Sequence, residues 1–150
     1  MTDGSINSEA ASPVRSDDGG GEQARAVLII GQDPETVDLS DPAVPPGTTP
    51  EKIRAGLAAA QKQLTDLGHR ADLVLTDRGE TAEEVIRERL VGNAYDCVVI
   101  GAGIRTVASS LMLFEKVVNA VHRSAPQAAI AFNTRPDDTA AAAIRWLWPG

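Results

Sequence analysis

Four short apolar segments alternate with segments of helical periodicity, and this alternation limits the folds open to the chain more than any other feature. The first segment, residues 26–30, is entirely apolar and stops at Gly31. Continuous apolar runs of this length are typical of strands buried on both faces of a parallel sheet. Comparable segments follow at 71–77, 95–100 and 128–132, of which 71–77 is the most polar. We therefore predict four strands, with 71–77 at an edge of the sheet.

A predicted helix follows each of the four strands. Thr49 is a suitable N-cap for the first helix, and Gly68 is placed to end it. A capping box that begins at Thr81 predicts the start of the second helix. The third helix has an apolar face across 111–121, and the fourth spans 140–147. Strands and helices in this alternation form a parallel sheet covered on both faces. The fold class that we predict is α/β, a three-layer open parallel sheet of four strands in the order 2-1-3-4.

The first 24 residues differ in composition from the rest of the chain. They contain five acidic residues, one arginine and a run of three glycines, with few apolar residues. A segment with so little to bury does not offset the entropy lost on ordering. We predict that residues 1–24 form a disordered acidic tail rich in Gly and Ser. Residues 25–150 have the length of one ordinary domain.

The charge balance and the cysteine count exclude several partners. Lys and Arg number 14 against 21 Asp and Glu, which gives a net charge of −7. Binding to nucleic acid or to an anionic membrane needs a basic surface, so we predict neither partner. One cysteine and two histidines are too few for a disulfide framework or a zinc site, and we predict no metal. The sequence shows neither a signal peptide nor an apolar run of membrane length, which favours a cytoplasmic protein.

A candidate site lies where the predicted strand order reverses. Ligands of open α/β sheets bind at the carboxyl ends of the strands at this point, here between the first and third strands. Glycines let backbone N–H groups approach an anion, which an arginine can then pair with. Tight turn geometry alone is the alternative explanation for the glycines. The candidate ligand-binding residues, from three loops, are Gly31, Gln32, Asp33, Gly101, Gly103, Arg105, Asn133 and Thr134.

The first of these loops extends to residue 49, although such connections usually take about 2–6 residues. It carries several carboxylates, which are ligands that Mg²⁺ and Ca²⁺ prefer. Their spacing does not match an EF-hand, and the prolines of the loop are unlike a phosphate cradle. Metal binding is therefore one interpretation of this loop. The second is a lid that is capped by its own side chains, and the third is direct contact with a ligand through Gln32 or Asp33.

Three segments carry a resemblance to a known family. They are VLIIGQDPE at 27–35, YDCVVIG at 95–101, and AAIAFNT followed by RPDD at 128–138. Together they resemble the receiver domain of response regulators, which implies a flavodoxin-like fold. The chain is also similar to small bacterial flavodoxin-like proteins with no assigned activity, a resemblance that implies no chemistry.

The chain departs from the receiver pattern at its chemical positions. Asp33 occupies one position of the acidic pair, and Gln32 replaces its partner. Gly101 stands where the resemblance would place the phosphorylated aspartate, whereas Thr134 matches the switch hydroxyl. The fifth strand with its lysine has no counterpart. Without a carboxylate at residue 101 no aspartyl phosphate forms, so the resemblance implies a domain that does not signal by aspartyl phosphorylation.

Two functional hypotheses follow from the sequence. The first is a non-catalytic binding or interaction module, favoured by the acidic tail and by the lack of a catalytic triad. The second is a small enzyme or ligand-binding protein for an anionic small molecule. In it Arg105 holds the anion, Asp33 acts as a base or a metal ligand, and Asn133 and Thr134 orient the substrate. The sequence identifies no cofactor. The apolar surface of Trp146 and Trp148 near the chain end either packs on the sheet or covers an exposed edge in a homodimer.

Overall fold

The computed structural model describes residues 24–147, so almost all of the predicted tail, as well as Trp148, lies outside the described residues. The strands are β1 (Ala26–Gln32), β2 (Arg70–Thr76), β3 (Cys97–Ile100) and β4 (Ala129–Phe132). The α-helices are α1 (Pro50–Asp66), α2 (Ala82–Gly92), α3 (Ala102–Arg105), α4 (Leu111–Ser124) and α5 (Thr139–Leu147). Short 3-10 turns are η2 (Pro34–Thr36), η3 (Ala108–Ser110) and η4 (Pro136–Asp138).

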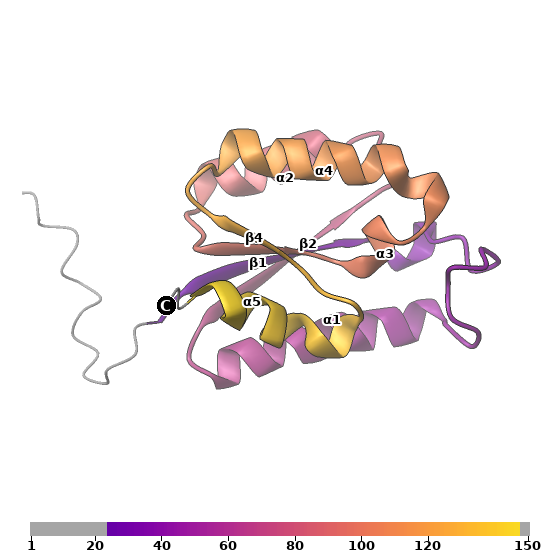
Figure 1. Cartoon of the computed structure of the whole chain (residues 1–150), viewed down its shortest axis with the longest axis horizontal. Helices are drawn as coiled ribbons and strands as arrows, with labels where there is room; N and C mark the ends of the chain where they lie inside the picture. The colour runs from indigo at the N-terminus through magenta and orange to yellow at the C-terminus, as the bar shows by residue number, and fades with distance from the viewer. Residues whose placement is uncertain (1–23, 148–150) are drawn as a thin grey trace, which may run out of the picture.

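The four strands form one parallel sheet in the order β2-β1-β3-β4. Helices α1 and α5 cover one face and α2 and α4 cover the other, with the carboxyl ends of the strands at the right of the view (Figure 1). This architecture confirms the predicted three-layer, flavodoxin-like α/β fold and the position of β2 at an edge. No helix within residues 24–147 is long and apolar enough to cross a membrane.

Two hydrophobic cores, one on each face, account for the continuous apolar runs of the central strands. Leu28, Ile30 and Val98 belong to the core under α2 and α4. Val27 and Ile29 belong to the core under α1 and α5. Because successive side chains of β1 enter opposite cores, every position needs an apolar residue. Each such fully buried aliphatic side chain stabilises the fold by about 1.5–3 kcal/mol.

The predicted ends of the first helix and the predicted start of the second helix after Thr81 are confirmed, whereas the capping box itself does not form. The Thr49 hydroxyl accepts a hydrogen bond from the Lys52 N–H at 3.1 Å. Gly68 takes a φ of +95° directly after the C-cap of α1. Thr81 makes no capping hydrogen bond, because its hydroxyl donates to the carboxylate of Asp77 at 2.7 Å. Asp77 also accepts from the N–H of Gly79, so the carboxylate organises this turn.

Cys97 lies in β3 with a fully buried side chain. Burial, and then the charge of Asp96, raise the pKa of its thiol to about 12. The thiolate is the form that attacks thiol reagents, so we expect Cys97 to react only when the domain opens. With a free energy of unfolding of about 5 kcal/mol, the native protein should react with Ellman's reagent about 5000-fold more slowly than the denatured chain. Equal rates in buffer and in denaturant would contradict this prediction.

Candidate functional site

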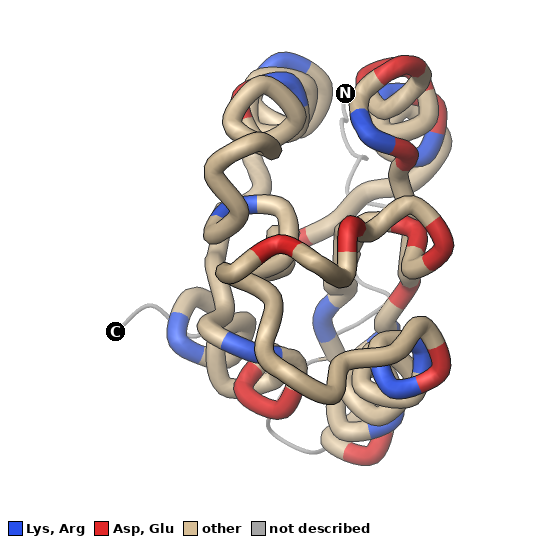
Figure 2. Tube along the Cα trace, turned by 90° about the vertical axis from the view of Figure 1, so that its right-hand side faces the viewer, with Lys and Arg blue, Asp and Glu red and all other residues tan. Residues whose placement is uncertain are grey.

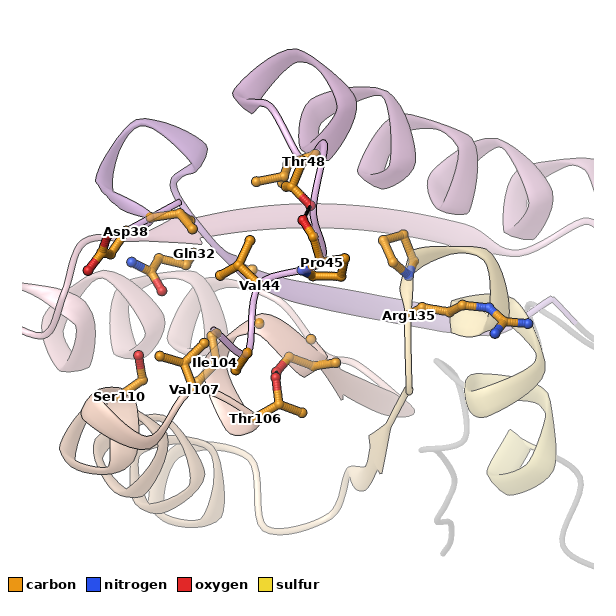
Figure 3. Close-up of a pocket in the computed structure, with 18 of the residues that line it drawn as sticks. Gln32, Asp38, Val44, Pro45, Thr48, Ile104, Thr106, Val107, Ser110 and Arg135 are labelled. Carbon is orange, nitrogen blue, oxygen red and sulfur yellow. Dashed lines mark hydrogen bonds between the residues drawn. The ribbon is translucent and has the colours of Figure 1, made fainter. Parts of the chain in front are cut away.

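A pocket opens at the carboxyl edge of the sheet, where the strand order reverses. Its volume is about 720 Å³. Residues at or directly after the carboxyl ends of β1, β3 and β4 contribute to its walls. The long loop between β1 and α1 lies at this edge of the sheet (Figure 1) and lines the pocket (Figure 3). The pocket therefore occupies the place that the strand order indicates for a ligand.

Apolar side chains form two opposing walls of the pocket. Val44 and Pro45 come from the long loop, and Ile104 and Val107 come from α3 and the segment after it. Figure 3 shows the first pair on one side of the pocket and the second pair on the other. Further apolar lining residues are Ile29, Val37, Ile53 and Leu57. A ligand seated here would bury apolar surface on both of its sides.

The lining also contains hydroxyl groups and charged side chains. The hydroxyl-bearing residues are Thr36, Thr48, Thr106, Ser109, Ser110 and Thr134. The charged lining residues are Lys52, Arg78, Arg135 and Asp38. Cations thus outnumber carboxylates in the lining, although the whole chain carries a net charge of −7. Over the described part of the chain, Figure 2 shows acidic and basic residues interspersed around this edge, so the cationic excess is local to the pocket.

The charged residues of the lining differ in their availability. The Nε of Arg135 donates to the Asp137 carboxylate at 2.6 Å, and its side chain points away from the pocket (Figure 3). The hydroxyl and the N–H of Ser40 donate to Asp38 and lower the pKa of its carboxyl group, which is therefore ionised at neutral pH. Lys52 and Arg78 remain as the cations that can meet an anionic ligand.

The structure brings six of the eight predicted site residues to the pocket. They are Gly31, Gln32, Gly101, Gly103, Asn133 and Thr134. Of these, Gln32 uses its Nε2 to donate to the carbonyl and the hydroxyl of Thr36, at 3.1 and 3.0 Å. The hydroxyl of Thr134 donates to Asp138 within the loop after β4. Gly103 is exposed, and a side chain at this position would enter open space.

Asp33 and Arg105 do not line the pocket. The carboxylate of Asp33 accepts from the Glu35 N–H at 3.0 Å and lies 3.9 Å from the guanidinium of Arg54. An aspartate directly before a short helical turn finds the free N–H groups of that turn first, which is the usual behaviour of a capping residue. Arg105 donates to the Asn133 carbonyl at 2.6 Å and lies over the Phe132 ring at 5.8 Å. Both charges therefore have local partners.

Asn133 links three elements at the base of the pocket. Its side chain is buried, with 6% of its surface exposed. The Oδ1 accepts from the Ala102 N–H at 2.8 Å, and the Nδ2 donates to the Thr139 hydroxyl at 2.7 Å. Asn133 thereby joins the end of β4 to the starts of α3 and α5. Because both ends of the amide are engaged, its contribution to the site is to hold the walls in place.

Lys52, Arg78 and Val44 are pocket residues that sequence reasoning missed. Arg78 follows the end of β2 by two residues, and this end lies at the same edge as those of β1 and β3. The parallel pairing of β2 with β1 therefore indicates that Arg78 lies at the pocket edge. Lys52 lies in the first turn of α1, which begins at this edge. Val44 carried no such signal, because the path of a long loop does not follow from local sequence.

The position that the receiver resemblance assigns to a phosphorylated aspartate holds a glycine at the end of β3. Gly101 has an ordinary φ of −68°, but a Cβ atom there would lie 3.3 Å from the Ile30 carbonyl oxygen. The close approach of β1 therefore favours a residue without a side chain. Within residues 24–147 no three His, Cys, Asp or Glu side chains gather closely enough to hold a metal ion.

No protein-family model matches the chain, and no curated protein matches its sequence.

Proposed function

We propose that this protein is a binding module of the cytoplasm that holds a small organic anion in the pocket at the carboxyl edge of its sheet. The observation that carries the proposal is the pocket's composition: two apolar walls stand beside Lys52 and Arg78 in an otherwise acidic chain. Apolar walls with a few polar groups are typical of small-molecule sites. The buried free thiol of Cys97 is compatible with a reducing compartment.

Binding without catalysis is favoured by where the reactive side chains lie. His69 is buried next to the amino end of β2, where its Nδ1 accepts from the Arg25 N–H, and His122 lies on α4. Neither histidine lines the pocket, nor does Cys97. The alternative hypothesis of an enzyme assigned the base to Asp33, which is engaged by Glu35 and Arg54.

Signalling by aspartyl phosphorylation is not part of the proposal. A phosphoacceptor needs a carboxylate at the end of the third strand, and residue 101 is glycine. Magnesium-assisted phosphoryl transfer needs several oxygen ligands close together. The Asp33 carboxylate instead caps the turn after β1. We expect no incorporation of phosphate from acetyl phosphate.

A thermal-shift screen with a variant that obstructs the pocket tests the binding function. Small carboxylates, phosphates and nucleotides are screened against the full chain and against Gly103→Trp. A ligand at a hundred times its Kd should stabilise the wild-type protein by about 2.7 kcal/mol. Gly103→Trp should lose this shift, because the indole occupies the exposed pocket wall.

Gly92→Trp is the matched control, since a side chain at Gly92 also enters open space and the residue ends α2, outside the pocket lining. It should respond to the ligand as the wild type does. The proposal fails if no compound stabilises the protein, or if Gly103→Trp responds as strongly as Gly92→Trp.

A homodimer remains a prediction from the sequence, and two exposed aromatic residues support it. Phe132 at the end of the edge strand β4 is 37% exposed, and Trp146 on α5 is 53% exposed. An edge strand without charged residues is open to pairing with a second chain. Sedimentation equilibrium should give twice the chain mass of 15.7 kDa, and Trp146→Glu should shift the population to the monomer. A wild-type monomer at all concentrations would rule the dimer out.

A further inference from the structure

The loop that covers the pocket is organised by its own short-range hydrogen bonds. We call residues 37–48 the strap. Asp38 accepts from the N–H of Ser40, Asp41 accepts from the N–H of Ala43, and the Thr48 hydroxyl donates to the Pro45 carbonyl. These turns give the strap a local shape. They do not tie it to the rest of the domain.

The two cations of the pocket hold the two ends of the strap. Arg78 donates from Nε to the Thr36 carbonyl at 2.7 Å, directly before the strap begins. Lys52 donates from Nζ to the Gly47 carbonyl at 3.0 Å, one residue before the strap ends. Both side chains are exposed, and both line the pocket. The groups suited to meet an anion are thus the groups that fasten the strap.

A carbonyl oxygen is a weaker partner for these cations than an anion is. Hydrogen bonds between a cation and a carboxylate or phosphate are about twice as strong as neutral ones. Lysine has three donors and arginine has five, so both residues can reach an anion while moving off their carbonyls. An anion that enters the pocket therefore competes directly with the ends of the strap.

We propose that Lys52 and Arg78 are the anion-recognition pair of the pocket, and that the carbonyls of Thr36 and Gly47 occupy them in the free protein in place of the ligand. A ligand carboxylate or phosphate draws the two side chains away from the carbonyls and loosens the strap. The loosened strap can then move, so that Val44 and Pro45 pack against the apolar body of the ligand. Recognition of the ligand by Lys52 and Arg78, which we call the ligand half of the inference, rests on the proposed function. The fastening of the strap in the free protein does not.

The apolar walls define the class of ligand further. Val44 and Pro45 face Ile104 and Val107 across the pocket. Inorganic phosphate would leave these walls without a partner, whereas an organic acid with an aliphatic body fills them. The ligand class is therefore an amphipathic organic acid, and hexanoate is a simple probe of it.

The fastening of the strap is tested by amide hydrogen exchange on the full chain without any ligand. The double variant Lys52→Met/Arg78→Met keeps the apolar stems and removes the charged donors. Amides of the strap should exchange about fivefold faster, as expected for the loss of about one net hydrogen bond, because Gln32 still donates to the Thr36 carbonyl in this variant. Lys62→Met is the matched control, because Lys62 is on the same helix and pairs with Asp66 outside the pocket. Exchange in the strap at the wild-type rate in the double variant overturns the inference.

The ligand half is tested with sodium hexanoate, using sodium chloride at the same ionic strength as the reference. In the wild type, hexanoate should speed amide exchange in the strap, because the ligand loosens it. Hexanoate should also raise the thermal stability of the wild-type protein. The double methionine variant should show neither effect. Binding that persists in the double variant but is lost in Gly103→Trp overturns the anion-recognition pair and leaves the proposed function standing. Failure of wild-type protein to bind hexanoate overturns the ligand class. Failure to bind any compound of the earlier screen overturns the proposed function.

Discussion

Replacing Asn133 with alanine should lower the free energy of unfolding by about 2–4 kcal/mol. The substitution removes the acceptor of the Ala102 N–H and the donor to the Thr139 hydroxyl. The side chain is buried, so water does not readily replace either partner. An N–H group left without a partner in such a position costs its full desolvation, which is why the expected loss exceeds that of an ordinary hydrogen bond.

Equilibrium unfolding in urea measures the effect, with Asn119→Ala as the control. Asn119 is exposed on α4 and donates only to the Glu115 carbonyl within its own helix, so its replacement should change stability by no more than about 0.5 kcal/mol. Asn133→Asp should fall between the two, since its carboxylate still accepts from Ala102. If Asn133→Ala and Asn119→Ala unfold at the same urea concentration, Asn133 does not hold the pocket together.

Replacing Gly56 with valine should destabilise the domain by about 2–3 kcal/mol, although valine is a better helix former than glycine. Gly56 lies in α1, where a Cβ atom would come within 2.8 Å of the Pro136 Cβ and 3.2 Å of its Cγ. Real Cβ atoms do not approach so closely, and a proline ring cannot turn aside. The loop after β4 therefore has to move away from α1, and the pocket wall that Pro136 forms moves with it.

Ala55→Val separates this clash from the general cost of a β-branched residue in a helix. Ala55 precedes Gly56 in α1 and is exposed, so its replacement should cost about 0.5 kcal/mol. Thermal unfolding of both variants measures the difference. A Gly56→Val protein as stable as Ala55→Val would show that α1 and the turn at Pro136 are not in contact in solution.

The sheet was predictable because strands that are buried on both faces have a recognisable sequence pattern. Residues 26–30 and 97–100 are apolar without alternation, which occurs when neighbouring side chains enter different cores. The edge strand β2 carries Arg70 and Asp72, which form an ion pair at 3.3 Å, and its sequence is accordingly more polar. Strand order followed from placing this polar strand at an edge and the strongest apolar runs at the centre.

The location of the pocket was predictable, but the contacts of the charged residues around it were not. Strand order located the carboxyl edge, whereas Asp33 and Arg105 found partners within a few residues or across one strand. Lys52 lies in the first turn of α1 and Arg78 lies in the turn after β2. Both line the pocket because of the directions that their side chains take, which no periodic pattern encodes. A charged side chain in a loop hydrogen-bonds to the nearest backbone group that has no other partner. Which group is nearest depends on the path of the folded backbone.

The position of the first strand in the middle of the sheet has a consequence for how the chain acquires its fold. β1 pairs on one side with β2, beginning with Ala26 opposite Arg70, and on the other with β3, beginning with Val27 opposite Cys97. The Ala26 N–H also donates to the Asp96 carboxylate across a separation of 70 residues. During synthesis, β1 therefore leaves the ribosome long before its second neighbour exists. Such distant pairings slow folding and leave an apolar strand exposed in the nascent chain, where chaperones bind.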